Sequence, residues 1–405
     1  MRKKYFDPTI TLQKVIGDQI YEALNGPVIE YIRQEKDAGE TDDFVKEYHE
    51  NRNMMIEERS FPNLYRICMQ AKRAIGFEKD VDFYIVSDST PNAGSIASNN
   101  PDMQPHVVEL NSGLIHLLTE QELLYVIGHE IGHLINGDTQ IIRLRRFVYG
   151  DEKDNVPDFI KNRINLYQLL SEIGADRYGF IACGGDEKVA ITAEYKLHSG
   201  IDISKMNVNL NALMEENKKH LDYFMSSNRF IGDSHPVHPI SIYCLHLYAT
   251  CKTQEQLDEE MAKIEDRFYN LDEEDATFNY FYVAAGYLLS NIDGEPSDSQ
   301  KQEIAYKVGV RCWFPAEFID QVLQTNDLEQ LYHNTVKLLA DLDEDNKVVM
   351  LDFLVDLAFR DGKFSEQELH FIYRFGHEVG WNDEQIAYYI SGLISRHFIP
   401  NVLLS

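Results

Sequence analysis

Apolar residues recur at helical spacing along most of the chain, and one short region departs from this pattern. The spacing predicts helices at residues 63–77, 119–136 and 157–182. The runs 81–87 and 106–110 are instead rich in β-branched and aromatic residues, which predicts two strands. The turn-rich stretch between them predicts a loop or a weak strand. We therefore expect an α+β fold, mostly helical with a small β-sheet, and a C-terminal part made of helices only.

The helix at residues 119–136 has the best-defined ends. Thr119 and Glu122 have the spacing of a capping box, in which each residue bonds the backbone N–H of the other. Gly137 follows the last apolar residue of this helix and is placed to end it. The helix at 157–182 has an early proline and a glycine pair after its end, which predicts its limits as well.

Breaks in the pattern predict three domains. Residues 1–58 form an N-terminal helical arm, and residues 59–270 contain the predicted strands and the long helices. Within this second domain, the polar stretch 226–239 predicts a loop. After an acidic run, residues 271–405 form the all-helical domain. A weak repeat with the spacing D-G-x-x-S, at Asp293 and at Asp361, predicts two related helical hairpins there.

Charge and cysteine content narrow the expected partners and compartment. With 38 Lys+Arg against 67 Asp+Glu the formal net charge is −29, so the average surface repels a phosphate backbone and we expect no nucleic-acid partner. No apolar run has the length of a membrane span or the form of a signal peptide, so we expect a cytoplasmic protein with no integral membrane segment. The five cysteines are spread without a C-x-x-C pair, which is typical of core thiols in a reducing compartment.

Candidate chemistry is concentrated in the predicted helix at 119–136, which contains the motif H-E-x-x-H at His129, Glu130 and His133. Positions i and i+4 share one face of a helix, so both imidazoles can bind one Zn²⁺ ion while Glu130 contacts an attacking water. The motif lies within an apolar run, where unpartnered polar groups are costly to bury. The alternative is a pair of surface histidines beside a solvated glutamate.

A catalytic zinc site needs a third protein ligand. The predicted helix at 157–182 offers Glu172 and Asp176, four residues apart on one face. We assign Glu172 as the third ligand and Asp176 as an acceptor that orients a ligating histidine. The alternative is a solvated acidic face of that helix.

Together, three motifs in order resemble the gluzincin metallopeptidases that include HtpX and the CAAX prenyl endopeptidases. These motifs are Pro91-Asn92-Ala93 followed by a strand and Gly113-Leu114, the HEIGH helix, and the E-x-x-x-D of Glu172 and Asp176. The resemblance implies a zincin-like domain with Zn²⁺ as cofactor and a protein or peptide as substrate. It also implies that Asn92 and Ala93 lie on an edge strand that pairs with the substrate backbone.

The chain departs from that family in two respects. It contains no membrane span, so it resembles the catalytic domain alone. The family also has His-Pro with an arginine six residues after the histidine, whereas the position six after His235 is Ser241. His235 is our candidate donor to the oxyanion, with metal binding by His235 or His238, or capping of a loop, as alternatives. Tyr243 is a second candidate donor.

Residues 351–381 resemble the helical TerB-like domains of tellurite resistance, on the basis of Asp361, Gly362, Ser365 and Glu368. The resemblance implies an acidic metal site, but Ser365 and Glu368 also have the spacing of a capping box, which we favour. A protein partner of this domain is a further expectation.

These observations predict a zinc metalloendopeptidase in which Glu130 is the general base. Two alternatives remain at this point. The peptidase domain can be latent or inactive, so that the chain acts as an adaptor or sensor through its TerB-like domain. The same site can also hydrolyse a non-peptide amide.

Overall fold

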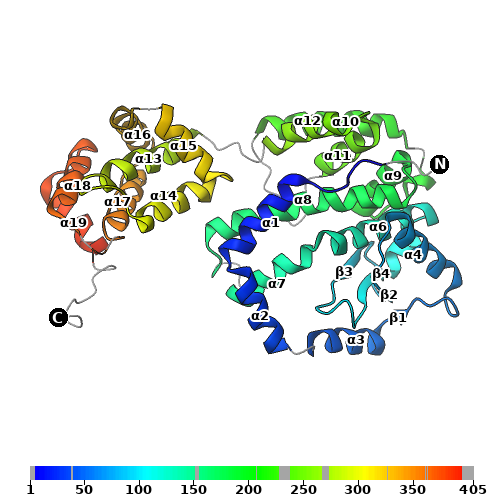
Figure 1. The fold of residues 1–405 in the computed structure, drawn as a ribbon. Helices are drawn as coiled ribbons and strands as arrows, with labels where there is room; N and C mark the ends of the chain where they lie inside the picture. Colours follow the sequence, from blue (N-terminus) through cyan, green and yellow to red (C-terminus); the bar gives the residue numbers. More distant parts are fainter. Residues whose placement is uncertain are drawn as a thin grey trace. The chain divides into compact units, whose positions relative to one another are not determined.

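The computed structural model describes residues 5–37, 40–150, 155–206, 208–227, 238–266, 273–325, 327–360, 362 and 364–394. The chain divides into two compact units, Met1–Phe268 and Tyr269–Ser405, and each is described by itself. Unit 1 contains a small sheet with helices around it, and the described elements of unit 2 are helices (Figure 1). This agrees with the expected α+β class.

The sheet of unit 1 has the strand order β1-β2-β4-β3. The two predicted strands, β2 (Val81–Val86) and β4 (His106–Asn111), pair in parallel at its centre. Strand β3 (Ala93–Ile96) is antiparallel to β4 at one edge, so the turn-rich stretch contains a true strand. At the other edge β1 (Met54–Met55) pairs with β2. β1 was not predicted, because two residues are too few for an alternating pattern.

Helices α6 (Glu120–Asn136) and α8 (Asp158–Ala182) pack closely together and carry the candidate site. The predicted capping box of α6 is confirmed, and Gly137 ends the helix with φ +74°. Glycines permit the close approach of the two helices, because a Cβ on Gly128 would lie 2.3 Å from Cβ of Ala182. Helix α6 also contacts β3 and β4, which brings the edge strand beside the helical layer.

The N-terminal segment is part of the packing of unit 1. Helix α1 (Thr11–Ala23) contacts α8 and buries Leu12, Ile16 and Ile20. Helix α2 (Gly26–Asp37) contacts α7 (Asp138–Tyr149), which begins directly after the end of α6. These contacts make α1 a component of the helical layer.

The remaining helices of unit 1 surround this centre. They are α3 (Glu40–Arg52), α4 (Pro62–Ile75), α5 (Ser112–Leu117), α9 (Glu187–Ser199), the 3₁₀ helix η2 (Ile203–Lys205), α10 (Leu210–Ser227), α11 (His238–Thr250) and α12 (Gln254–Glu265). The predicted loop at 226–239 falls mostly on residues 228–237, which lie outside the described residues, and its two ends belong to α10 and α11.

Unit 2 is built from helices around an apolar core that includes Phe281, Phe353 and Phe375. The helices are α13 (Glu273–Ser290), α14 (Asp298–Arg311), α15 (Pro315–Thr325), α16 (Leu328–Leu342), α17 (Glu344–Ala358), α18 (Glu366–Glu378) and α19 (Asp383–Ile394). The predicted capping box of Ser365 and Glu368 is confirmed, and Ser297 has the same role before α14. Asp361 lies outside the described residues.

Two further sequence-based expectations, on membrane spans and on cysteines, concern both units. Among the described helices, none has the length and apolar character that a membrane crossing requires. The five cysteines are free thiols, and Cys68, Cys183 and Cys244 are buried.

Candidate metal centre

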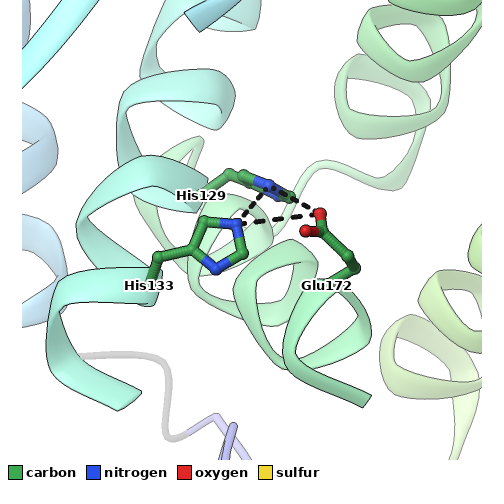
Figure 2. Close-up of side chains that lie close together, drawn as sticks. All are labelled: His129, His133 and Glu172. Carbon is green, nitrogen blue, oxygen red and sulfur yellow. Dashed lines mark hydrogen bonds and ion pairs between the residues drawn. The ribbon is translucent and has the colours of Figure 1, made fainter. Parts of the chain in front are cut away.

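Three predicted ligands from two helices converge at one point of unit 1. His129 and His133 project from consecutive turns of α6, and Glu172 projects toward them from α8 (Figure 2). The two Nε2 atoms are 3.0 Å apart, and Oε2 of Glu172 lies 3.4 Å from Nε2 of His129 and 3.7 Å from Nε2 of His133. One ligand atom from each residue thus lies within 4.8 Å of the other two.

The other nitrogen of each imidazole is held by a buried aspartate. Nδ1 of His129 lies 2.8 Å from Oδ1 of Asp176, and Nδ1 of His133 lies 2.9 Å from Oδ2 of Asp138. When each Nδ1–H donates to its carboxylate, both Nε2 lone pairs face each other across 3.0 Å. Two such lone pairs repel unless a proton or a metal cation lies between them.

The pKa values of the two histidines are raised by the carboxylates that contact them. Burial disfavours the charged form of His129, but hydrogen bonds to Asp176 and Glu172 outweigh it and raise its pKa well above the ordinary value. Burial also opposes the charge on His133, and the hydrogen bond to Asp138 and the charge of Glu172 raise its pKa. The pocket therefore favours positive charge at the point where the three ligand atoms meet.

The donor set fits zinc. Two imidazole nitrogens and one carboxylate oxygen are a known catalytic zinc set, with a fourth position left for water or substrate. Ligands at about 2.0–2.1 Å from a tetrahedral ion are separated by about 3.4 Å. The observed separations of 3.0, 3.4 and 3.7 Å bracket this value. Carboxylates on both Nδ1 atoms are also typical of zinc-bound histidines.

A cavity of about 550 Å³ opens at these ligands and joins the other candidate residues. Glu130 is 8% exposed and lines the cavity beside His129 and His133. Asn92 and Ala93, at the start of the edge strand β3, line the same cavity. The general-base candidate and the candidate substrate strand therefore face the space that the metal ligands face.

The oxyanion candidates are not brought together in this way. His235 lies outside the described residues, as does the side chain of His238. Tyr243 is on α11, where burial raises its pKa, and it is not among the described residues that line the cavity. Ser241, two residues earlier on α11, does line the cavity.

Asp138 was not identified from the sequence, nor were the side chains that hydrogen-bond to Asp138 and Asp176. Asp138 is the first residue of α7; its carboxylate also accepts hydrogen bonds from Ser171 and, at 2.9 Å, from Nε2 of Gln13 on α1. Asp138 had a local signal, an acidic residue directly after the glycine that ends the motif helix. Ser171 and Gln13 had none, because each meets Asp138 across a long sequence separation.

Tyr125 and Glu194 were missed for the same reason. The Tyr125 hydroxyl lies 2.9 Å from Oδ1 of Asp176 and 2.7 Å from Oε1 of Glu194. Burial, and then the charge of Asp176, raise the pKa of Glu194 to about 8. Both residues line the cavity, so the polar network around His129 extends to α9.

Comparison with known proteins supports a metallopeptidase of the HtpX type for part of the chain. Residues 58–148 match the model of peptidase family M48, a stretch that includes β2, β3, β4 and α6. The chain is similar to an HtpX protease homologue of Streptococcus gordonii, with 35% identity over 86 residues. It is also similar to one of Methanocaldococcus jannaschii, with 36% identity over 87 residues. A third relative is the plastoglobule-localized metallopeptidase 48 of Arabidopsis thaliana, with 22% identity over 174 residues.

The similarity is partial on both sides. It covers 21%, 22% and 42% of this chain and 28%, 29% and 49% of the Streptococcus, Methanocaldococcus and Arabidopsis proteins. The search of solved structures found no match. The family match ends before α8, so Glu172 and Asp176 lie outside it.

Proposed function

We propose that this chain is a zinc-dependent metalloendopeptidase. His129, His133 and Glu172 hold the ion, and Asp176 orients His129 through Nδ1. The convergence of the three ligand atoms carries this proposal. The M48 match and the HtpX relatives support it independently of the geometry.

Glu130 is the general base in this mechanism. When bound, zinc supplies Lewis-acid polarisation of the scissile carbonyl and lowers the pKa of water. Glu130 removes a proton from the attacking water and returns it to the leaving amine. Its place in the cavity beside both histidines supports this role. Asp176 and Asp138 keep the two imidazole rings oriented while the proton moves.

The substrate in this proposal is an extended peptide beside β3. An edge strand leaves backbone groups unpaired, and a peptide binds them by adding a strand to the sheet. Asn92 and Ala93 line the cavity with Glu130, so a peptide paired there would pass the general base. His235 remains our proposed donor to the oxyanion, and the recruitment of a protein partner by unit 2, through a TerB-like domain, remains a proposal as well.

Substitution of Glu130 tests the mechanism. Purified Glu130→Gln protein should retain about one zinc ion per chain by elemental analysis, because the ligands are intact. Its cleavage of an unfolded, casein-type substrate should fall by about 10²- to 10⁴-fold. Glu120→Gln is a matched control, because Glu120 is an exposed residue in the first turn of the same helix and should affect neither measurement.

The outcomes separate the alternatives. Cleavage by Glu130→Gln at the wild-type rate would contradict the proposed mechanism. Stoichiometric zinc with an intact substrate in the wild type would favour the adaptor role. Cleavage of small amides, with peptides left intact, would favour a non-peptide amidase.

A further inference from the structure

A chain of hydrogen bonds leads from His129 into the interior of unit 1. Oδ1 of Asp176 lies 2.8 Å from Nδ1 of His129 and 2.9 Å from the Tyr125 hydroxyl, and that hydroxyl lies 2.7 Å from Oε1 of Glu194. Tyr125, Asp176 and Glu194 come from α6, α8 and α9, respectively. Their exposed fractions are 0% for Tyr125, 4% for Asp176 and 5% for Glu194, so bulk water competes little for these bonds.

The number of available hydrogens determines which group donates and which accepts in each of these hydrogen bonds. A tyrosine hydroxyl has one hydrogen, yet here it lies at hydrogen-bond distance from two carboxyl groups. It can donate to one of them, so the other contact requires a hydrogen on the carboxyl group. Asp176 already accepts from Nδ1–H of His129 when Nε2 faces a metal ion, which identifies Asp176 as the acceptor.

The remaining hydrogen therefore belongs to Glu194. Its carboxyl O–H donates to the Tyr125 oxygen, and the Tyr125 O–H donates to Asp176. Burial and the nearby charge of Asp176 both oppose ionisation of Glu194, and its raised pKa agrees with this assignment. Each hydrogen of this hydrogen-bond chain then has an acceptor, and Oδ1 of Asp176 accepts from both His129 and Tyr125.

We propose that Tyr125 and Glu194 are positioning residues of the metal centre. Neutral Glu194 orients the Tyr125 hydroxyl toward Asp176, and Asp176 in turn fixes the ring and tautomer of His129. This inference rests on the proposed role of His129 as a zinc ligand, but it concerns zinc affinity and does not require peptide hydrolysis.

Zinc affinity, measured by competition with a chromogenic chelator, tests the positioning role. Tyr125→Phe keeps the ring and removes the hydroxyl, and it should weaken zinc binding by about tenfold, as loss of outer-shell partners does. Glu194→Ala should also weaken binding, whereas Glu194→Gln should not, because its amide N–H can donate to Tyr125. Tyr84→Phe, at another buried tyrosine of unit 1, is the control and should bind zinc like the wild type.

A double-mutant cycle separates positioning from a general structural effect. If Glu194 acts through Tyr125, Glu194→Ala should cause no further loss of zinc affinity in the Tyr125→Phe protein. Additive losses of zinc affinity would overturn the proposal that Glu194 acts through Tyr125. Unchanged zinc affinity in Tyr125→Phe would overturn the positioning role itself.

Infrared difference spectroscopy reads the proton on Glu194 directly. A protonated carboxylic acid has a carbonyl stretch that carboxylates lack, and Glu194→Gln should remove one such band from the wild-type spectrum at neutral pH. Glu122→Gln is the matched control, since the buried Glu122 forms an ion pair with Lys196 at 2.9 Å and its replacement should remove no such band. A wild-type spectrum without a band that Glu194→Gln removes would overturn the neutral state.

The two proposals fail in different ways. Zinc binding that depends on Tyr125, in a protein that cleaves no peptide, would contradict the proposed function and support this inference. Peptide cleavage with zinc affinity insensitive to Tyr125 would do the reverse.

Discussion

Nε2 of His129 lies 3.0 Å from Nε2 of His133, while the Nδ1 atoms of the same rings contact two different buried aspartates. This relationship makes the space between the rings a site for a cation. Because the pKa values of both histidines are raised, we expect this space to hold a proton in the metal-free protein. Zinc therefore has to displace protons in order to bind.

Zinc affinity should accordingly fall as the pH falls. Each displaced proton changes the affinity by about tenfold per pH unit while the imidazoles are protonated in the metal-free state. Calorimetric titration at pH 7 in buffers with different ionisation enthalpies should reveal the release of at least one proton per zinc ion. A heat of binding that is the same in every buffer would contradict the raised pKa values.

Glu172→Gln should remove the third ligand while preserving the size of the side chain. We expect zinc affinity to fall by at least about a hundredfold, because a neutral amide oxygen is a poor zinc ligand. Competition with a chelator measures the loss, and Glu130→Gln is the matched control because it should keep wild-type affinity. If the two variants bind zinc equally well, Glu172 is not a ligand.

Asp138→Asn should weaken zinc binding by about ten- to a hundredfold. The amide retains an oxygen acceptor but lacks the charge that holds Nδ1–H of His133. Asp158→Asn, at the exposed first residue of α8, should leave the affinity unchanged. Equal affinities in the two variants would show that the contact with His133 does not contribute to zinc binding.

Gly128→Ala should destabilise unit 1. The added Cβ would lie 2.3 Å from Cβ of Ala182 and 3.0 Å from the carbonyl oxygen of Tyr178, so α6 and α8 would have to separate. We expect a loss of about 1–3 kcal/mol in the free energy of unfolding, as for other overpacked sites, together with weaker zinc binding. Denaturant titration measures the first effect.

The contrasting control is Gly392→Ala in α19. There a Cβ meets no atom within 4 Å, so the substitution should be neutral or stabilising. Equal effects at the two glycines would contradict the packing argument.

Ionisable groups of the candidate metal centre should reduce the stability of the metal-free protein as the pH rises from about 4.5 to about 8. The pKa of Glu194 is raised to about 8 from the ordinary 4.5, so the folded state binds the proton across this interval while the unfolded state releases it. The raised pKa values of His129 and His133 act in the same direction above about 6.5.

Glu194→Gln should reduce this pH dependence, because its amide does not titrate. Thermal unfolding after chelator treatment, compared at pH 5 and pH 8, measures the difference between the variant and the wild type. The same slope in both proteins would place the pKa of Glu194 near its ordinary value.

Local patterns predicted the elements of this fold better than the contacts between them. The helix at 119–136 was predictable because its capping box, its apolar face and its final glycine agree with one another. Strand β1 was not predictable, since its two residues form a strand through pairing with the distant β2.

The candidate site shows the same contrast between residues placed by local helix geometry and residues placed by long-range packing. His129, Glu130 and His133 were predictable because helical geometry alone places them together, and Glu172 and Asp176 because they share one helical face. Tyr125, Glu194 and Gln13 were not. Tyr125 and Gln13 contact the two aspartates, and Glu194 contacts Tyr125, only after helices distant in sequence have packed. Packing is a property of whole helices, and the spacing of residues along one helix does not reveal it.

Gln13 links helix α1 to the candidate metal centre, because its amide donates a hydrogen bond to Asp138, whose carboxylate contacts His133. If zinc binds more tightly when α1 is docked, thermodynamic linkage requires that zinc also favours docking of α1 by the same factor. Depletion of zinc would then increase the fraction of molecules in which α1 is detached and accessible to proteases. Protease sensitivity of the N-terminal segment would thus report whether the candidate site holds zinc.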